Sequence, residues 1–347
     1  MGFPSQQHEL PLWIIASALL STLSLNAVSH AAAVASVQSS LATPRIAFAS
    51  KRDGNWEIYV MDADGGAQTR LTRRPGEDRF PIWSPDGSRI LFGSVDDSRW
   101  ELWVMDADGG NPGLLTADVV AKGSRDWSPD GSRIVFESKR DGDGDLYTIR
   151  ADGGALTKLT QNDVEDRNPA WSPDGTMIAY TSMQAGNREI HVMRADGSGI
   201  RRLTDHAAAD DEPVWSPDGT QIVFASARNG NRDLYVVGGD GRNLRRLTSD
   251  PAEEYVPVWS PDGSRIAFQA LRGENYDVEI VSADGRSRTR VSDAPEYDGS
   301  HHWSPDGKML AFISGRGGYD GVYSFEVGTG VVRRLTREAS LTPRFGR

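Results

Sequence analysis

The chain has 347 residues, with 38 basic against 49 acidic side chains, a net charge of −11, and no cysteine. The negative balance argues against nucleic acid and anionic membranes as partners, because both attract clustered lysine and arginine. The absence of cysteine excludes disulfides, cysteine-ligated zinc, iron–sulfur clusters and thiol catalysis.

The N-terminal stretch is typical of an export signal. Leu10–Leu25 is apolar but shorter than the roughly 20 residues that a membrane span needs. Small residues over 31–35 then offer cleavage sites. We therefore predict a signal peptide over residues 1–35, and a periplasmic or secreted protein with no membrane span after cleavage. An uncleaved anchor is the alternative, because the stretch before Leu10 carries no lysine or arginine.

A short linker over residues 36–43 is expected to precede a single domain over 44–347. The first strand pattern of this domain is Arg45–Ser50, where an aliphatic and an aromatic residue two apart face the same side. A second strand pattern follows at Ile58–Met61, then an Asp-Gly turn, and then a third short strand that ends in Leu-Thr.

A five-residue motif, Trp-Ser-Pro-Asp-Gly, begins a fourth element and recurs every 44 residues. Its tryptophans are Trp83, Trp127, Trp171, Trp215, Trp259 and Trp303. Units of this length with four short strands and no helical pattern are typical of β-propeller blades. The sequence therefore predicts an all-β propeller.

The units resemble the WD40-like (PD40) repeat of the TolB-like β-propeller family. The family signature, Trp-Ser-Pro-Asp-Gly-x-x-Ile-Ala-Phe followed by Ile-Tyr-x-Met and Asp-Gly, is matched over residues 44–345. The resemblance implies a propeller fold and a binding scaffold of the cell envelope. The chain differs from TolB itself, which carries an α/β domain between its signal and its propeller.

The repeat count predicts seven four-stranded blades. Three of the four strand types occur seven times, whereas the Trp strand occurs six times. The tail segment Pro343-Arg344-Phe345 has the same Pro-x-aromatic form as Pro81-Ile82-Trp83. We expect residues 341–346 to pair inside the blade that begins at Arg45, because closure removes free sheet edges. Six blades with a spare unit is the alternative.

The repeated motif is expected to be structural. Proline, aspartate and glycine suit a tight turn, and each tryptophan is expected to pack between blades. Strand direction places the Ser-Pro-Asp-Gly and Asp-Gly turns on one face, called here the turn face. The other two loop sets lie on the opposite, loop-rich face, where the sequence varies most and where we expect function.

Two sets of charged residues recur on the loop-rich face. Five positions before each tryptophan lie Asp78, Lys122, Asp166, Asp210, Glu254 and Asp298; 26 positions upstream of these lie Arg52, Asp96, Arg140, Gln184, Arg228 and Arg272. The signs reverse together at Lys122 and Asp96. This pattern predicts salt bridges between the two sets, such as Arg52 with Asp78, and a ring that binds a cation or a basic partner is the alternative.

The candidate site residues lie where units depart from the repeat. Most units read Pro-x before the tryptophan, but the third reads Arg125-Asp126 and the seventh His301-His302. We predict a binding site on the loop-rich face from Asp126, His301 and His302, together with Glu296 and Asp298 upstream.

Oligogalacturonate lyases have a similar propeller and use histidines with a metal, so a metal or acid–base site from one histidine with Asp126 is the alternative. His191 and His206 show no metal-ligand spacing. We therefore expect no catalytic residue, no metal and no cofactor.

The function expected from the sequence is a non-catalytic, monomeric, exported propeller that binds a protein or polysaccharide partner. The alternative is a lyase or hydrolase that acts on a polysaccharide in the central channel.

Deletion of Leu341–Arg347 is expected to lower the melting temperature and the solubility, because it would leave a blade with a free edge. An unchanged melting curve would contradict this closure scheme.

Overall fold

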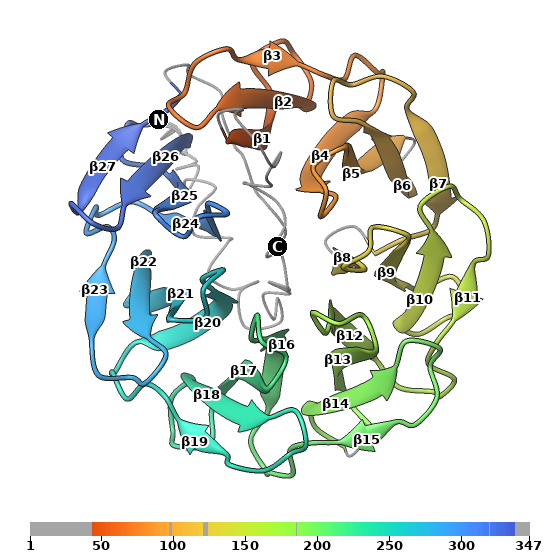
Figure 1. Ribbon diagram of the computed structural model, residues 1–347, viewed down its shortest axis with the longest axis vertical. Coiled ribbons are helices and arrows are strands. Elements are labelled where there is room, and N and C mark those ends of the chain that lie inside the picture. Colours follow the sequence, from red (N-terminus) through yellow and green to blue (C-terminus); the bar gives the residue numbers. More distant parts are fainter. Residues whose placement is uncertain (1–43, 97–98, 121–123, 185, 319, 337–347) are drawn as a thin grey trace, which may run out of the picture.

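The computed structural model describes residues 44–336, except 97–98, 121–123, 185 and 319. Strands β1 to β27 form seven antiparallel sheets arranged as a ring around a central axis (Figure 1). The predicted signal peptide, the linker and the closing strand over 341–346 all lie outside the described residues. Within the described part, no helix is present that could cross a membrane.

Each blade is a meander whose strands follow the chain from the axis outward. The innermost strands are β4 (Glu77–Trp83), β8 (Arg125–Trp127), β12 (Asp166–Trp171), β16 (Asp210–Trp215), β20 (Glu253–Trp259) and β24 (Asp298–Trp303). The second strands are β1 (Arg45–Ser50), β5 (Arg89–Asp96), β9 (Arg133–Ser138), β13 (Met177–Ser182), β17 (Gln221–Ser226), β21 (Arg265–Arg272) and β25 (Met309–Ser314).

The third strands are β2 (Glu57–Asp62), β6 (Arg99–Asp106), β10 (Asp145–Arg150), β14 (Glu189–Arg194), β18 (Asp233–Gly238), β22 (Asn275–Ser282) and β26 (Gly321–Glu326). The outer strands are β3 (Thr69–Arg70), β7 (Gly113–Ala117), β11 (Thr157–Lys158), β15 (Arg201–Arg202), β19 (Arg245–Arg246), β23 (Arg288–Arg290) and β27 (Val331–Arg334). Blade 1 is therefore β1–β3 among the described strands, and blades 2 to 7 have four strands each.

The ring closes between blades 7 and 1. The side-chain amide of Gln68 donates a hydrogen bond to the carbonyl oxygen of Leu335, at 3.1 Å. Ile46 of blade 1 and Ile313 of blade 7 also belong to one buried apolar cluster. The seven-bladed ring is thus confirmed, and the alternative of six blades with a spare unit is wrong.

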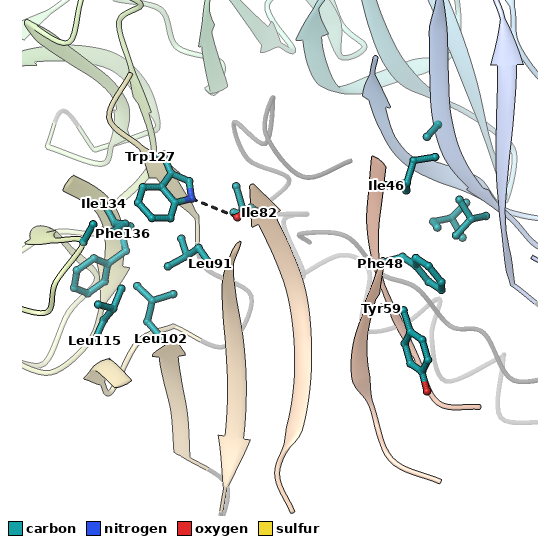
Figure 2. Packing of buried hydrophobic residues seen from close by; sticks show 14 of the residues in the cluster. Ile46, Phe48, Tyr59, Ile82, Leu91, Leu102, Leu115, Trp127, Ile134 and Phe136 are labelled. Atoms are coloured by element: carbon teal, nitrogen blue, oxygen red, sulfur yellow. Dashed lines mark hydrogen bonds between the residues drawn. The ribbon is translucent and has the colours of Figure 1, made fainter. Parts of the chain in front are cut away.

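Each tryptophan of the repeat packs on the preceding blade, as predicted. Trp127 lies on Leu91 of blade 2, and its indole nitrogen donates to the carbonyl oxygen of Ile82 at 3.4 Å (Figure 2). Trp259 and Trp303 make the same bond to their preceding blades, at 3.3 and 3.1 Å. Loss of such a buried ring would cost about 3–5 kcal/mol of unfolding free energy.

The Ser-Pro-Asp-Gly segment is a turn held by its own side chains. In the first copy, the Ser84 hydroxyl donates to the Asp86 carboxylate at 2.6 Å and accepts the Arg89 amide at 2.9 Å. Asp86 also accepts the Ser88 amide at 3.0 Å, and Gly87 has a φ of 69°. The segment thus forms the tight turn that its proline, aspartate and glycine predict.

The glycine of the Asp-Gly turn lets neighbouring blades approach. Gly197 has a φ of 85°, and a β-carbon added there would lie 2.9 Å from the carbonyl oxygen of Leu159 in the preceding blade. The same approach occurs at Gly65 against Leu335 and at Gly285 against Leu247. A side chain at these positions would push two blades apart.

Gly197→Ala is expected to lower the unfolding free energy by about 2–3 kcal/mol, because both the positive φ and the contact with Leu159 penalise a β-carbon. Gly230→Ala is the matched control, since Gly230 has a φ of 101° and nothing within 4 Å of an added β-carbon. It should cost about 1–2 kcal/mol, because only the positive φ penalises the β-carbon there. If both variants lose the same unfolding free energy in urea denaturation, the contact between Gly197 and the preceding blade does not add to the cost of a β-carbon.

Candidate functional site

The innermost strands are distorted where they line the loop-rich end of the channel. Five of the six shift register against their second strand, just after the strand start. Each bulge places a residue other than glycine at positive φ: Phe80 (58°), Asn168 (56°), Glu212 (60°), Val256 (55°) and Ser300 (49°). A non-glycine residue in this region costs about 1–3 kcal/mol, and such strain concentrates at functional sites.

The bulges turn polar groups toward the next blade and link blades 2 to 7 in series. The bonds are Arg125 side chain to Phe80 carbonyl (3.1 Å), Ser124 hydroxyl to Asn168 (3.0 Å), Asn168 amide to Asp211 (2.7 Å), Val256 backbone N–H to Glu212 (2.8 Å) and His301 Nε2 to Val256 carbonyl (3.0 Å). This series stabilises the channel wall, because buried polar groups need partners.

Two adjacent carboxyls of the wall differ in their electrostatics. Burial raises the pKa of Glu212 to about 7, although Arg232 lies 3.4 Å away. Burial also acts on Asp211, but Arg232 at 3.8 Å and Arg188 at 3.0 Å outweigh it and hold the pKa of Asp211 below its ordinary value. Both carboxyls are thus engaged by guanidinium groups and blade contacts.

Aromatic and guanidinium side chains gather at the loop-rich end of the channel. We call this set the loop-rich mouth: Trp56, Arg79, Phe80, Trp100, Arg188, Arg232, Tyr255, Tyr276 and Tyr297. Phe80 contacts Trp100 with ring centroids 5.7 Å apart, and Arg79 lies over Trp56 at 4.6 Å. On the other side, Tyr276 contacts both Tyr255 (6.0 Å) and Tyr297 (5.9 Å), and Arg232 covers Tyr255 at 4.8 Å.

Most of the loop-rich mouth was missed by the sequence reasoning. One signal could have found it: the residue type 27 positions before each repeat tryptophan varies around the ring. It holds Trp56, Trp100, Gly144, Arg188, Arg232 and Tyr276. Because the repeat gives no structural reason for this variation, it marks a place where blades differ for another purpose.

The predicted site residues of blade 7 lie near this mouth or within the blade. Glu296 is exposed in the loop before β24. Asp298 is buried at the start of β24, where it accepts the Ser292 hydroxyl and pairs with Arg316 at 3.5 Å. His301 and His302 are buried, and burial lowers the pKa of His301 to about 4, so this ring is neutral.

Asp126 lies at the other end of the channel. It precedes Trp127, the last residue of β8, and its carboxylate accepts the Trp171 backbone N–H at 3.1 Å. There it borders a cavity of about 300 Å³, called here the turn-face cavity, which is otherwise lined by Ala170, Trp171, Pro173, Val214, Trp215, Pro217, Val258, Trp259, Pro261, Trp303 and Pro305. Asp126 is thus remote from Glu296 and Asp298. No three His, Asp or Glu side chains among the described residues could together hold a metal ion.

The predicted pairing of the charged sets had the wrong partner. Arg228 pairs with Asp210 of its own blade at 2.6 Å, and not with Glu254. The reason is register: Asp210 lies opposite Ser226, which brings Arg228 beside it. Asp78 makes no ion pair with Arg52 or with any other described residue within 4.0 Å, and Lys122 lies outside the described residues.

Comparison with known proteins identifies a family. The family model described as the TolB beta propeller domain (PD40) matches residues 20–121, 119–198, 166–255 and 249–345. No curated protein matches the sequence.

The fold is shared with several solved structures. The putative TolB from Agrobacterium tumefaciens is 24% identical with a TM-score of 0.57, over 75% of this chain and 95% of that chain. Oligogalacturonate lyase from Vibrio parahaemolyticus is 16% identical with a TM-score of 0.71, over 86% and 90%. A puromycin hydrolase is 17% identical with a TM-score of 0.68, over 90% of this chain and 54% of that one. At these identities the likeness concerns the fold alone.

Asp78→Asn is expected to remove part of the pH dependence of stability. Burial raises the pKa of Asp78 to about 6, partly offset by the Ser94 and Thr72 hydroxyls. The folded chain therefore holds a proton between pH 4 and 6 that the unfolded chain has lost. Its unfolding free energy falls over this window as pH rises, by up to about 3 kcal/mol from this group. The variant should lack this decrease and be more stable than wild type at pH 8.

Asp211→Asn is the control, because Arg232 and Arg188 outweigh burial and hold the pKa of this carboxyl below its ordinary value. It should be less stable than wild type at pH 8, because it deprives Arg188 and Arg232 of their carboxylate. Denaturant melts of both variants at pH 4.5 and 8 make the comparison. If Asp78→Asn is less stable than wild type at pH 8, the ionised Asp78 carboxylate does not destabilise the folded chain and the prediction is wrong.

Proposed function

Because the chain belongs to the TolB β-propeller domain family, we propose that it is a non-catalytic binding scaffold of the cell envelope. It holds a protein partner at the loop-rich mouth. Family membership and the TolB structures among its fold relatives support a protein as the partner class. The polysaccharide named as a second partner class in the sequence analysis stays a prediction.

One observation carries the proposal: tryptophan, tyrosine and arginine gather at the loop-rich mouth. These are the residues that most often dominate the binding energy of protein interfaces. The turn face repeats one turn six times, whereas the equivalent position at the mouth holds four residue types over six blades: tryptophan, glycine, arginine and tyrosine. An asymmetric wall on a symmetric fold suits recognition of one asymmetric partner.

The electrostatics of the mouth support binding over catalysis. Asp211 and Glu212 are engaged by Arg188, Arg232 and the neighbouring blade. A general base must instead have a carboxylate or imidazole that is free to reach the substrate. His301 uses Nε2 for a bond to the Val256 carbonyl oxygen, which ties that ring to the wall.

Export completes the proposed function. Residues 1–35 act as a signal peptide cleaved within 31–35, and the propeller works as a monomer in the periplasm or outside the cell. The acidic net charge of −11 makes nucleic acid an unfavourable partner.

The alternative is a polysaccharide lyase or hydrolase with its site in the channel. The specific observation in its favour is the fold shared with an oligogalacturonate lyase in complex with manganese, at 21% identity and a TM-score of 0.67. Incubation with oligogalacturonate and Mn²⁺, followed by ultraviolet absorbance for unsaturated uronate, tests it. We expect no product. If product forms with wild type and is lost in His301→Ala or His302→Ala, the scaffold proposal is wrong and the enzyme alternative is supported.

Trp100→Ala and Tyr297→Ala are expected to reduce partner capture at least tenfold, because each removes a large side chain from opposite sides of the loop-rich mouth. Immobilised mature protein is exposed to an envelope extract of the native host, and retained proteins are quantified by mass spectrometry. Leu156→Ala is the matched control, since Leu156 is 44% exposed and lies beside the turn before β11, away from the mouth.

All three variants are first checked by thermal melting. A protein retained equally by wild type, Trp100→Ala and Tyr297→Ala would exclude the loop-rich mouth as its binding site. If the wild-type protein retains nothing from the extract, the scaffold proposal is wrong.

A further inference from the structure

The turn-face cavity has an apolar wall with one carboxyl in it. Tryptophan, proline, valine and alanine side chains line about 300 Å³ of space, and Asp126 is the one charged residue among the described residues that line it. A volume of this size equals about ten water molecules, which is ample for a single long side chain. The cavity lies at the opposite end of the channel from the loop-rich mouth.

Asp126 is a departure from the repeat. The equivalent positions of blades 4, 5 and 6 hold Ala170, Val214 and Val258, which line the same cavity. An apolar residue would therefore serve the wall at this position. A carboxyl in an apolar wall is unfavourable unless its charge is compensated, so the exception calls for a ligand or a structural partner.

Among the described residues, no basic side chain forms an ion pair with this carboxyl within 4.0 Å. Burial raises the pKa of Asp126 to about 7, and only the backbone N–H groups of Trp171 and Trp127 oppose the rise. The adjacent Arg125 directs its guanidinium to the Phe80 carbonyl oxygen. By contrast, the buried Asp211 of blade 5 is paired with Arg188 and Arg232. Asp126 thus lacks the compensation that the fold gives to a comparable carboxyl.

We propose that the turn-face cavity is a receptor for one basic side chain, lysine or arginine, of a protein partner. The aliphatic stem would lie against the tryptophan and proline side chains, and the cationic tip would pair with Asp126. Such amphipathic side chains bury their stems in apolar surroundings while the charged head finds a polar group. Tryptophan is also the aromatic residue that attracts cations most strongly, and the net charge of −11 favours approach of a basic partner.

The chemistry of the wall favours an organic cation over a metal ion. Calcium takes six to eight oxygen ligands, and the cavity offers one carboxyl among apolar side chains. No His, Asp or Glu trio that could hold a metal occurs among the described residues. A lysine or arginine side chain needs only one carboxylate for its charged group and apolar surroundings for its methylene groups.

Binding should be linked to the proton on Asp126. A cation favours the ionised carboxylate, so affinity should rise as pH increases from about 5.5 to 8 and level off above the pKa of free Asp126. No other described residue that lines the cavity is titratable, and the neighbouring Arg125 stays charged over this range. The slope of affinity against pH therefore reports on Asp126.

The test uses the mature full-length protein and N-acetyl-arginine amide as the probe, followed by tryptophan fluorescence and calorimetry. Saturable binding is expected, at least tenfold weaker for the neutral analogue N-acetyl-citrulline amide and for Asp126→Asn. Asp152→Asn is the matched control, because Asp152 is exposed on the turn face outside the cavity. Equal binding of the two probes, equal binding by Asp126→Asn, or no binding by wild type would overturn the proposal.

Two further measurements fix the source of the cation. If n-butylguanidinium binds but N-acetyl-arginine amide does not, the cavity takes free small cations and the proposed protein side chain is wrong. If the double variant Arg344→Gln/Arg347→Gln binds the probe at least tenfold more tightly than wild type, the chain's own tail competes for the cavity and a partner is excluded. Trp100→Ala should bind the probe like wild type, so failure at this cavity is distinguishable from failure at the loop-rich mouth.

Discussion

The contact between each repeat tryptophan and the preceding blade is the interaction on which the ring depends. One four-stranded sheet has two faces to cover and cannot do so alone. Trp127 covers the face of blade 2, and its indole N–H fixes the distance through the Ile82 carbonyl oxygen. Glycine in the Asp-Gly turn then removes the side chain that would keep the blades apart, as at Gly197 beside Leu159.

The innermost strands depart from regular β geometry, and this departure serves contacts between blades along the channel. Their bulges hold Val256 and Glu212 at positive φ, although both residues disfavour it. The distortion turns main-chain and side-chain groups toward the next blade and ties the channel wall together. These bonds cross-link the wall that carries the aromatic and guanidinium side chains of the loop-rich mouth. Preorganisation of this kind reduces the entropy lost when a partner binds.

The two ends of the channel differ because the strands run in one direction. The turn end receives the same residues from each blade, which produces a nearly uniform wall of tryptophan and proline. The loop end receives the positions that vary. Asp126 stands out at the uniform end because the equivalent positions of blades 4, 5 and 6 are apolar. Arg232 stands out less at the other end because the residue type at its position varies around the ring.

The sequence by itself determined the fold class, the number of blades and the packing role of Trp127 and its equivalents, because a 44-residue period fixes which strand follows which. It also singled out Asp126 as an exception. Only the tertiary structure decided which charged side chains meet. Arg228 pairs with Asp210 because strand register sets neighbours within a blade, and spacing along the chain cannot distinguish that pairing from one with the next blade. The mouth and the cavity exist only once the ring has closed, because each is built from several blades.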